Sequence, residues 1–377
     1  MAGIYIHIPF CKQACHYCNF HFSTNLKSKK TIIDYIIKEI KLKSKFENEE
    51  IETIYFGGGT PTLLTSLETE AIVNCIYKYY KVKSESEITI EANPDDITID
   101  RLKFLKKLSF NRLSIGVQSF IDSELKLMNR AHNSNKAIRS VEISKSIFNN
   151  ISVDLLYGLP DSNIETLDHN INILLNFDIK HISSYALTLE PKTALEKFIK
   201  KGLVELPNDD IVFEQFKHVN KELISNDYIN YELSSFAKKN FFSKNNTGYW
   251  LRKKYIGIGP SAHSYNGLYR SWNISNNKKY IDQIQSGKLY YKKEILTKID
   301  RYNEYIMTGL RTMWGISINF IENKFGKNFK NHFLKSIKKY IEQKLIHISN
   351  GMYITTDSAR FLADGIAADL FIIDLSE

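Results

Sequence analysis

The chain has 377 residues, of which 43% are apolar and 12% aromatic, a composition typical of a globular protein that buries a core. Its length predicts one large domain and a smaller one. No apolar run is long enough for a membrane-spanning helix, and no signal-peptide pattern precedes the first strand-like segment, so we expect a cytoplasmic protein. The net charge of +9 is spread along the chain, which favours a solvated basic surface over a nucleic-acid or membrane interface.

Short β-branched runs recur along the first half of the chain. They predict strands at 4–8, 51–56, 87–92, 112–117, 152–157 and 181–187. Stretches with helical periodicity lie between them, such as TIIDYIIKEIKLK and SLETEAIVNCIYKYY. This alternation predicts parallel strands joined by right-handed crossovers. We expect an α/β fold with a partial TIM-type (β/α)6 barrel, although an open sheet would give the same pattern.

The pattern changes after residue 290. A helix near 209–225 and a strand, YINYELSSF, still continue the first domain. From about residue 300 the chain reads as three helices, a hairpin and a last helix, with Asn350-Gly351 as a type I′ turn signal. This order is similar to a winged-helix module. We therefore predict a barrel domain with its extension over 1–290 and a small, mainly helical, winged-helix-like domain over 291–377.

Three of the four cysteines are concentrated near the N-terminus, in IYIHIPFCKQACHYCNF. Cys11, Cys15 and Cys18 form a C-x3-C-x2-C loop directly after the first strand. Three thiolates leave one position of a metal centre open, which suits a catalytic site better than a structural one. A structural zinc site completed by His16 or His21 is the alternative. The fourth cysteine, Cys75, lies in a predicted helix and is expected to point into the core.

Polar residues follow the predicted strands where a barrel ligand would bind, at the carboxyl ends. The second strand runs into FGGGTPT (56–62), where residues without Cβ would let the backbone approach a ligand closely. The other candidates stand at or near the ends of later strands and are Glu91, Gln118, Arg130, Asp154 and Ala186. Together with the cysteine loop, this rim is difficult to explain by structural zinc.

The cysteine motif, with Tyr17 before its last cysteine, resembles the radical S-adenosylmethionine (SAM) superfamily. YIHIPFC, FGGGTPT, EANP, NRLSIGVQSF, DLLYGLP and YALTLEPKT are similar to the oxygen-independent coproporphyrinogen III oxidase family over nearly the whole chain. The resemblance implies a 4Fe–4S cluster on Cys11, Cys15 and Cys18, with SAM on its open iron. The SAM site that it implies comprises Tyr5, Tyr17, Gly58, Gly59, Thr60, Glu91, Gln118, Arg130, Asp154 and Ala186. No catalytic residue beyond the cluster and this site is predicted.

Two departures separate the chain from true oxidases of that family. Phe20 replaces their further cysteine, and the chain begins almost at its first strand, without their N-terminal extension. Both features resemble the HemW-type branch, which implies a haem chaperone. That branch often carries H-N-x-x-Y-W, whereas this chain reads NNTGYW (245–250). The implied haem residues are Asn246, Tyr249 and Trp250, with His263 as an alternative iron ligand because Asn245 replaces the histidine.

Three hypotheses stay open at this point. The first is a HemW-type chaperone with haem as cargo, acceptor proteins that include membrane proteins, and an electron donor for the cluster; whether it turns SAM over is open. The second is a radical SAM oxidoreductase acting on a porphyrinogen or another substrate. The third is a nucleic-acid binder, because residues 321–344 hold seven lysines and two glutamates. Phe325, Phe329, Phe333 and Ile337 recur every four residues there, so the lysines need be only a solvated face, and no nucleic-acid partner is expected.

Overall fold

The computed structural model describes residues 2–46 and 49–373. Six parallel strands follow one another in chain order across a curved sheet, so the predicted partial (β/α)6 barrel is confirmed. Each predicted strand is present, and the third begins five residues earlier than expected because the polar segment 82–86 also pairs. The strands are β1 (Ala2–Ile8), β2 (Ile51–Gly58), β3 (Val82–Ala92), β4 (Arg112–Gln118), β5 (Asn150–Tyr157) and β6 (His181–Ala186).

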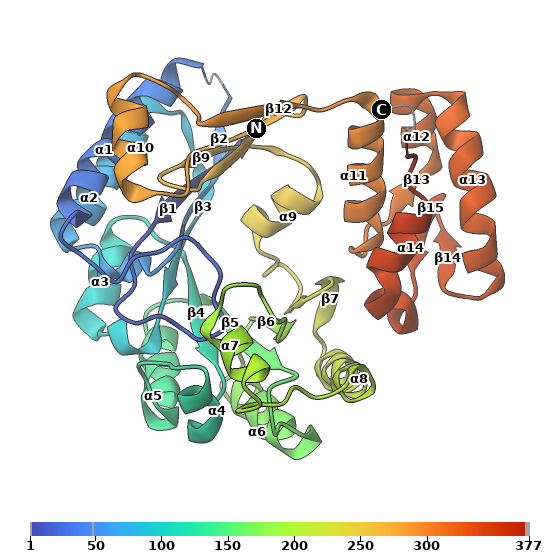
Figure 1. The fold of residues 1–377 in the computed structure, drawn as a ribbon, viewed down its shortest axis with the longest axis horizontal. Helices are drawn as coiled ribbons and strands as arrows, with labels where there is room; N and C mark the ends of the chain where they lie inside the picture. Colours follow the sequence, from blue (N-terminus) through green and yellow to red (C-terminus); the bar gives the residue numbers. More distant parts are fainter. Residues whose placement is uncertain (1, 47–48, 374–377) are drawn as a thin grey trace.

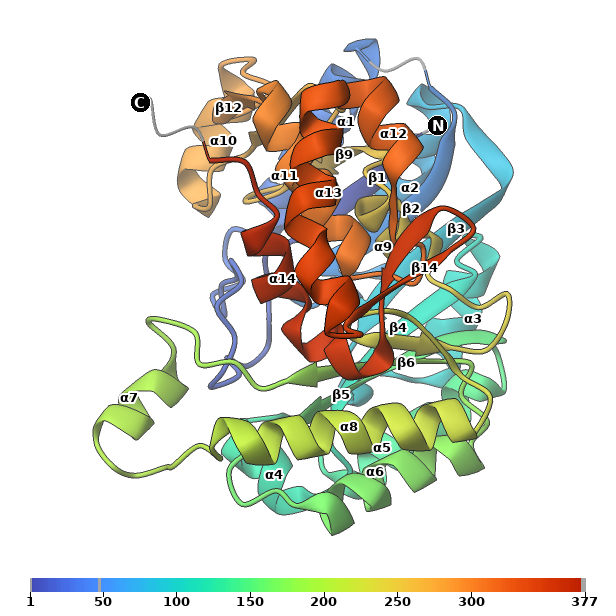
Figure 2. The same ribbon diagram turned by 90° about the vertical axis from the view of Figure 1, so that its right-hand side faces the viewer.

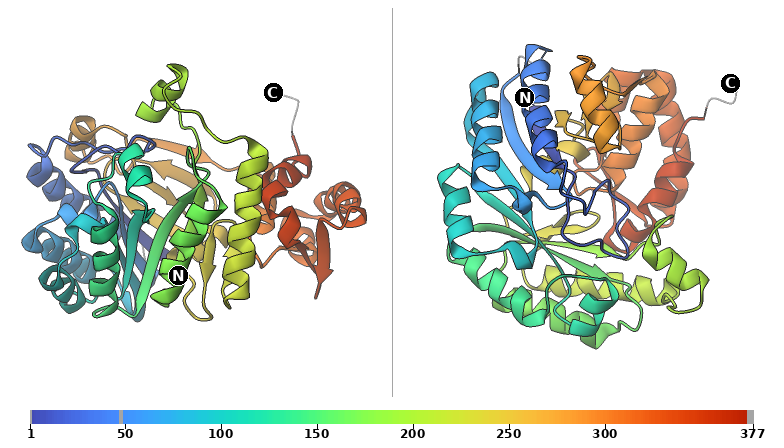
Figure 3. Two further views of the ribbon diagram at one scale, coloured as in Figure 1. Left: turned by 90° about the horizontal axis from the view of Figure 1, so that it is seen from below. Right: turned by 60° about the vertical axis from the view of Figure 1, so that its left-hand side comes forward.

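Helices cover the outer face of these strands (Figures 1 and 3). They are α1 (Lys29–Lys43), α2 (Ser66–Tyr79), α3 (Ile99–Lys107), α4 (Asp122–Leu127), α5 (Ser134–Lys145) and α6 (Ile164–Asn176). The α2 helix shows why they form where they do: Thr65 and Glu68 make a reciprocal capping box, and Ile72 and Ile76 are buried one turn apart.

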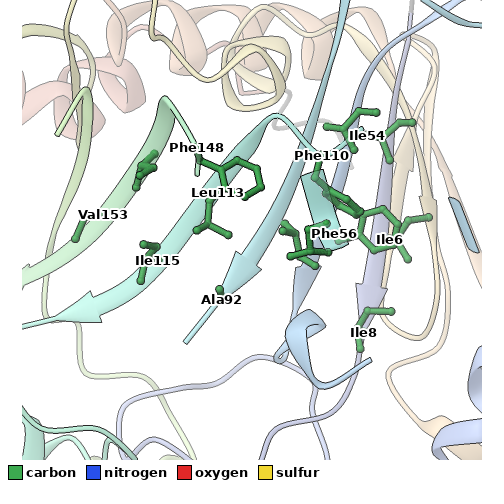
Figure 4. Close-up of a cluster of buried hydrophobic side chains, with 14 of the residues drawn as sticks. Ile6, Ile8, Ile54, Phe56, Ala92, Phe110, Leu113, Ile115, Phe148 and Val153 are labelled. Carbon is green, nitrogen blue, oxygen red and sulfur yellow. The ribbon is translucent and has the colours of Figure 1, made fainter. Parts of the chain in front are cut away.

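Strand alternation separates the outer core from the inner face of the sheet. On β1, Ile4, Ile6 and Ile8 are fully buried, whereas Tyr5 and His7 occupy the alternate positions. Figure 4 shows Phe56 of β2 beside Ile6, and Leu113 and Ile115 of β4 farther along the same cluster. The apolar residues therefore hold the helices, and the inner face is left for polar side chains.

Further strands extend the sheet at both edges. Beside β6 lies a hairpin of β8 (Ser235–Ala237) and β7 (Ile229–Glu232), preceded by α7 (Ala194–Lys200) and α8 (Asp209–Ser225). The single strand predicted over 228–236 is therefore wrong: Glu232 accepts a hydrogen bond from the Ser234 amide (3.3 Å) and the chain turns there.

Beside β1 the sheet continues with strands that the periodicity did not predict. The parallel β9 (Lys254–Ile258) comes first, followed by β10 (His263–Tyr265), β11 (Tyr269–Trp272) and β12 (Lys292–Ile295). Two helices belong to this part of the chain, α9 (Lys244–Trp250) and α10 (Asn277–Gln285). In Figure 1, α9 lies between the sheet and the C-terminal helices.

The C-terminal part forms a second hydrophobic core, around Tyr302, Ile306, Phe333 and Ile337. Its elements are α11 (Lys298–Leu310), β13 (Ile316–Ser317), α12 (Ile318–Phe325), α13 (Lys327–Glu342), β14 (Ile346–Ser349), β15 (Met352–Thr355) and α14 (Ala363–Asp369), seen in Figure 2. The three helices and the hairpin appear as predicted. Asn350 and Gly351 both have positive φ angles (51° and 76°), as a type I′ turn requires.

Several contacts join this C-terminal module to the sheet. Arg252 donates to Thr308 on α11 (3.1 Å), and Arg360 donates to the Asn230 carbonyl on β7 (2.8 Å). Phe361 packs against Phe216 of α8 with ring centroids 5.3 Å apart. Among the helices of residues 2–46 and 49–373, none combines the length and hydropathy that a membrane crossing needs.

Candidate functional site

The cysteine loop runs from the end of β1 across the mouth of the barrel (Figure 3, right). It has no helix or strand of its own, and neighbouring segments hold it. The Cys11 amide donates to the Ser23 carbonyl (3.1 Å), and the His16 amide donates to the Met128 carbonyl (3.1 Å). Gln13 donates to the Asn129 side chain (2.7 Å). These contacts fix the loop against the segment that follows α4, which also carries Arg130.

All three loop cysteines line one cavity of ≈ 520 Å³ on the inner face of the strands, here called the barrel cavity. Every residue predicted for the cluster and SAM lines this cavity except Ala186. Ala186 ends β6 one residue beyond the lining residue Tyr185, and it lies outside the lining. The predicted set therefore comes together in space, from five strands and three loops.

Arg130 joins the cysteine loop to the third and fourth strands. Its Nη1 lies 3.2 Å from Cys15 Sγ, and its Nη2 donates to Asn93 Oδ1 (2.7 Å) and to the Gly116 carbonyl (2.5 Å). Its buried Nε has no hydrogen-bond partner in the described structure. A buried donor without an acceptor is costly, and a ligand carboxylate in the barrel cavity would provide one.

Two buried carboxyl groups face the same cavity. Burial, with a smaller contribution from Asp154, raises the pKa of Glu91 to about 7, although Tyr55 (2.9 Å) and the Gly58 amide (3.2 Å) donate to it. Burial likewise raises the pKa of Asp154 to about 6. A cationic ligand would stabilise both carboxylates in their charged form.

The glycine turn after β2 lines the barrel cavity and also packs closely against the end of β1. A Cβ on Gly59 would lie 2.6 Å from the Phe10 carbonyl, and one on Gly58, where φ is 105°, would meet the His7 ring at 2.5 Å. The amides of Gly58, Gly59 and Thr60 all donate within the chain. The absence of Cβ therefore lets β2 pack against the end of β1, and any backbone contact to a ligand must come from carbonyl oxygens.

Other lining residues escaped the sequence prediction because it considered strand ends alone. Side chains at alternate positions of a strand share one face, and such pairs and triplets line the cavity. They are Arg112, Ser114 and Gly116 before Gln118 on β4, Ser152 and Leu156 around Asp154 on β5, and Ser183 with Tyr185 on β6. Gln118 itself has a φ of 73° at a bulge between β4 and β5, a strained backbone of the kind that gathers at functional sites.

The cysteines suit an iron–sulfur cluster better than zinc. Cys11, Cys15 and Cys18 are free thiols, half-exposed at the barrel cavity. Within the described residues no three His, Cys, Asp or Glu side chains are grouped closely enough to hold a single metal ion. His16 Nδ1 is bonded to the Leu127 carbonyl (2.7 Å) and His21 Nε2 to Asn277 (2.8 Å), and neither histidine lines the barrel cavity with the cysteines. Thiolates of an iron–sulfur cluster each bind a different iron, so they need not converge on one point.

A second, larger cavity of ≈ 890 Å³ adjoins the barrel cavity and is here called the α9 cavity. Tyr185, Asn246 and Tyr249 line both. The predicted haem residues Asn246, Tyr249, Trp250 and His263 all line the α9 cavity, so the structure brings these four together. Its far wall comes from α11 and the residue after it, with Glu304, Thr308 and Arg311.

Asn245 faces the barrel interior, away from the α9 cavity. Only 4% of its surface is exposed, and its side-chain oxygen accepts a hydrogen bond from Thr53 on β2 (3.2 Å). Glu87 on β3 accepts from the first two amides of α9, those of Lys244 (3.0 Å) and Asn245 (3.1 Å). Asn245 lines the barrel cavity but not the α9 cavity. A histidine at this position would therefore start from the wall of the barrel cavity, whereas His263 lines the α9 cavity.

Comparison with known proteins gives the family. A model of the radical SAM superfamily matches residues 5–174, and a model of the HemN C-terminal domain matches residues 296–362. Heme chaperone HemW of Bacillus subtilis is 35% identical, over 97% of this chain and 98% of that protein. Heme chaperone HemW of Lactococcus lactis is 32% identical, over 99% of this chain and 98% of the Lactococcus protein.

A solved structure gives the same fold. Coproporphyrinogen III oxidase (HemN) from Escherichia coli superimposes with a TM-score of 0.85, covering 98% of this chain and 90% of that one. At 22% identity this likeness shows the fold alone. The identity to the HemW proteins is higher and extends over almost their full length. The chain therefore belongs to the HemW family of radical SAM proteins.

Proposed function

We propose that this protein is a haem chaperone that holds a 4Fe–4S cluster and SAM in the barrel cavity and carries haem in the α9 cavity. The observation that supports this most directly is the adjacency of the two cavities, which share Tyr185, Asn246 and Tyr249. The relatives named Heme chaperone HemW supply the cargo, since they match almost the whole chain.

In this proposal Cys11, Cys15 and Cys18 are the cluster ligands. Burial raises the pKa of Cys11 to about 11 and also raises that of Cys18, so cluster assembly must displace protons from both thiols. Arg130, beside Cys15, fixes the loop and offers its unpaired Nε to the carboxylate of SAM. When bound, the cluster and SAM would supply the one-electron chemistry of the superfamily.

The remaining predicted residues bind and orient SAM in the proposal. Glu91 and Asp154 oppose the positive charges of SAM, and Tyr5, Tyr17, Gly58, Gly59, Thr60 and Gln118 complete the wall. Ala186 lies outside the lining, so only its position near Tyr185 connects it with the site. All these side chains stand on a rigid sheet or on the tethered loop, which suits a site that must hold its ligand in one orientation.

Phe20 supports the chaperone over a coproporphyrinogen oxidase. It lines the barrel cavity next to Cys18, is 67% exposed, and supplies no thiol at the position where the oxidases have a further cysteine. The proposal therefore does not include decarboxylation of a porphyrinogen.

The proposal divides the chain at about residue 290, with residues 1–290 forming the SAM domain and residues 291–377 the module that closes the α9 cavity. Its partners are an electron donor for the cluster and haem-acceptor proteins, including membrane proteins. It includes no nucleic-acid partner, because Phe325, Phe333 and Ile337 of the lysine-rich segment are buried in the second core. It places the protein in the cytoplasm, where thiols stay reduced.

The test is a haem titration of the anaerobically reconstituted full chain, followed by absorbance and compared with an Asn245→His variant. We expect the unaltered protein to bind haem and to release it to an apo-acceptor, and we expect Asn245→His to add little because position 245 faces away from the α9 cavity. Absence of binding by the unaltered chain, with binding restored by Asn245→His, would refute the proposed location of the cargo.

A further inference from the structure

His263 is held as a free imidazole at the α9 cavity. It pairs with Trp272 across β10 and β11, and the two rings stack with centroids 5.5 Å apart and planes 18° apart. The side chain is exposed, and neither ring nitrogen has a hydrogen-bond partner within the described residues. The cavity lining contains no other histidine and no cysteine or methionine. His263 is therefore the residue of this wall that could bind iron as a neutral ligand, and its stacking on Trp272 orients the imidazole ring.

Arg252 is a cation of the same cavity without an acidic partner. Its guanidinium stacks 4.3 Å from the centroid of the Tyr305 ring and donates to Thr308 (3.1 Å). No carboxylate of the described chain lies within ion-pair distance of it. Burial disfavours its charge, and the carboxylate of Glu304, which acts on it from beyond ion-pair distance, is itself paired with Arg270.

The other two arginines of the cavity are already neutralised. Arg270 is paired with Glu304 (2.5 Å), and Arg311 holds both oxygens of Asp364 (2.6 and 2.5 Å). The acidic residues of the wall include Glu232, whose pKa is raised by burial. Of the positive groups that line the cavity, Arg252 is consequently the one with charge to offer a ligand.

The rest of the wall suits a flat apolar ring system. Tyr249 and Tyr255 meet edge to face, with centroids 4.7 Å apart, and Trp250, Tyr265 and Trp272 add further aromatic surface. The volume of ≈ 890 Å³ lies within the range of roughly 300–1,000 Å³ that cofactor pockets occupy. An iron ligand, a free cation and aromatic walls are the three features that a haem with its propionates would need.

We propose that His263 is the axial ligand of the haem iron in the α9 cavity and that Arg252 is the ion-pair partner of a haem propionate. This inference rests on the proposed function, which supplies haem as the cargo. It assigns the iron and propionate contacts to residues outside the NNTGYW segment, so Asn245 need not act as an iron ligand.

The experiment titrates the reconstituted full chain with three probes: haemin, iron-free protoporphyrin IX, and haemin dimethyl ester, whose propionates carry no charge. The variants are His263→Ala and Arg252→Gln. Matched controls are His347→Ala and Arg139→Gln, because both residues are exposed and line neither cavity.

For His263→Ala we expect haemin binding to weaken by about tenfold or more and its Soret band to shift, since the iron loses its ligand. Protoporphyrin IX binding should stay unchanged, which also shows that the cavity is folded, and added imidazole should restore the band. An unaltered haemin spectrum in this variant would overturn the ligand assignment.

For Arg252→Gln we expect about a tenfold weaker affinity for haemin and protoporphyrin IX, and no change for the dimethyl ester. Equal weakening of all three probes would mean that Arg252 only packs on Tyr305, and would overturn its assignment. Arg252→Lys, which keeps the charge, should retain part of the preference for free propionates if Arg252→Gln does not fold. Failure of the unaltered chain to bind any probe would refute the proposed function, whereas binding that no variant alters would refute this inference alone.

Discussion

The barrel cavity and the α9 cavity meet at Tyr185, Asn246 and Tyr249, yet they are built differently. The first is formed by inward-facing residues of parallel strands and by one tethered loop, and it is rich in buried polar groups. The second is formed by two helices, a hairpin and the edge strands β9–β12, and its wall combines six tyrosine and tryptophan side chains with three arginines and three glutamates. Rigid polar walls suit a small charged ligand, whereas an aromatic wall shared between two cores suits a flat apolar cargo that must leave again.

The two cavities also differ in how easily their walls can move. The barrel cavity lies on the inner face of strands whose other face packs into one hydrophobic core, so its shape is fixed by strand packing. The α9 cavity lies between that core and the C-terminal core, and contacts such as Arg252–Thr308 and Arg270–Glu304 close it. A cavity between two cores can open without unfolding either. Changes aimed at one cavity should therefore leave binding in the other almost unaltered.

The largest expected effect comes from Cys15→Ser, which should abolish the brown cluster chromophore because two thiolates cannot hold it. Cluster content is measured by iron and sulfide analysis and by visible absorbance after anaerobic reconstitution. Protoporphyrin IX binding should change by less than about twofold, because Cys15 does not line the α9 cavity. A cluster of full iron and sulfide content in the variant would contradict the ligand assignment, and lost porphyrin binding would show that the two cavities are not independent.

A smaller effect is expected from Arg130→Ala. The change removes a charged donor whose Nε is unpaired in the barrel cavity, so SAM binding should weaken by about 1.5–3 kcal/mol. Calorimetry on the reconstituted protein measures the affinity. Arg139→Ala is the matched control, since Arg139 is exposed on α5. Unchanged SAM affinity would remove Arg130 from the site.

The pH dependence of SAM binding follows from Glu91 and Asp154. Burial raises their pKa values to about 7 and about 6, so protons compete with a cationic ligand below those values. We expect SAM affinity to be constant above pH 8 and to fall by about tenfold between pH 8 and 6 as Glu91 binds its proton. Calorimetry in two buffers should also detect proton release at pH 7. In Glu91→Gln the fall should move to lower pH, where Asp154 titrates; the same profile in variant and parent would contradict this origin.

The two cavities also show which parts of a site can be predicted from the sequence alone. The cysteine motif and the strand ends are local signals, and they predicted Cys15, Glu91 and Asp154 correctly as neighbours in one cavity. Inner-face residues such as Ser152 were missed, although the period of two along β5 contains that information. The crowding at the glycine turn could not be predicted, because the groups that approach Gly59 come from Ile8 and Phe10, about fifty positions away in the chain.

The contacts that form the α9 cavity join residues far apart in the chain, which no local sequence pattern connects. Arg252 meets Thr308 and Tyr305 across the junction of two cores, and His263 stacks on Trp272 through strands too short to show periodicity. The sequence motif did identify Tyr249 and Trp250, but it also drew attention to Asn245, which faces the other way. Which face of a seven-residue helix points into which cavity is decided by its contacts, here those of Glu87 and Thr53.

The smallest effect is expected for a substitution at Cys75, which lines neither cavity. Cys75 is 7% exposed on α2, and its Sγ lies 3.7 Å from the Ile37 carbonyl on α1. Cys75→Ala should therefore leave iron, sulfide, SAM affinity and porphyrin affinity unchanged, while the small void between α1 and α2 lowers the free energy of unfolding by about 1 kcal/mol. Denaturant unfolding and iron analysis on one preparation measure both. Cluster loss at intact secondary structure would mean that the fourth cysteine contributes to the cluster, and the barrel cavity could then no longer be treated as a site complete with its three loop cysteines.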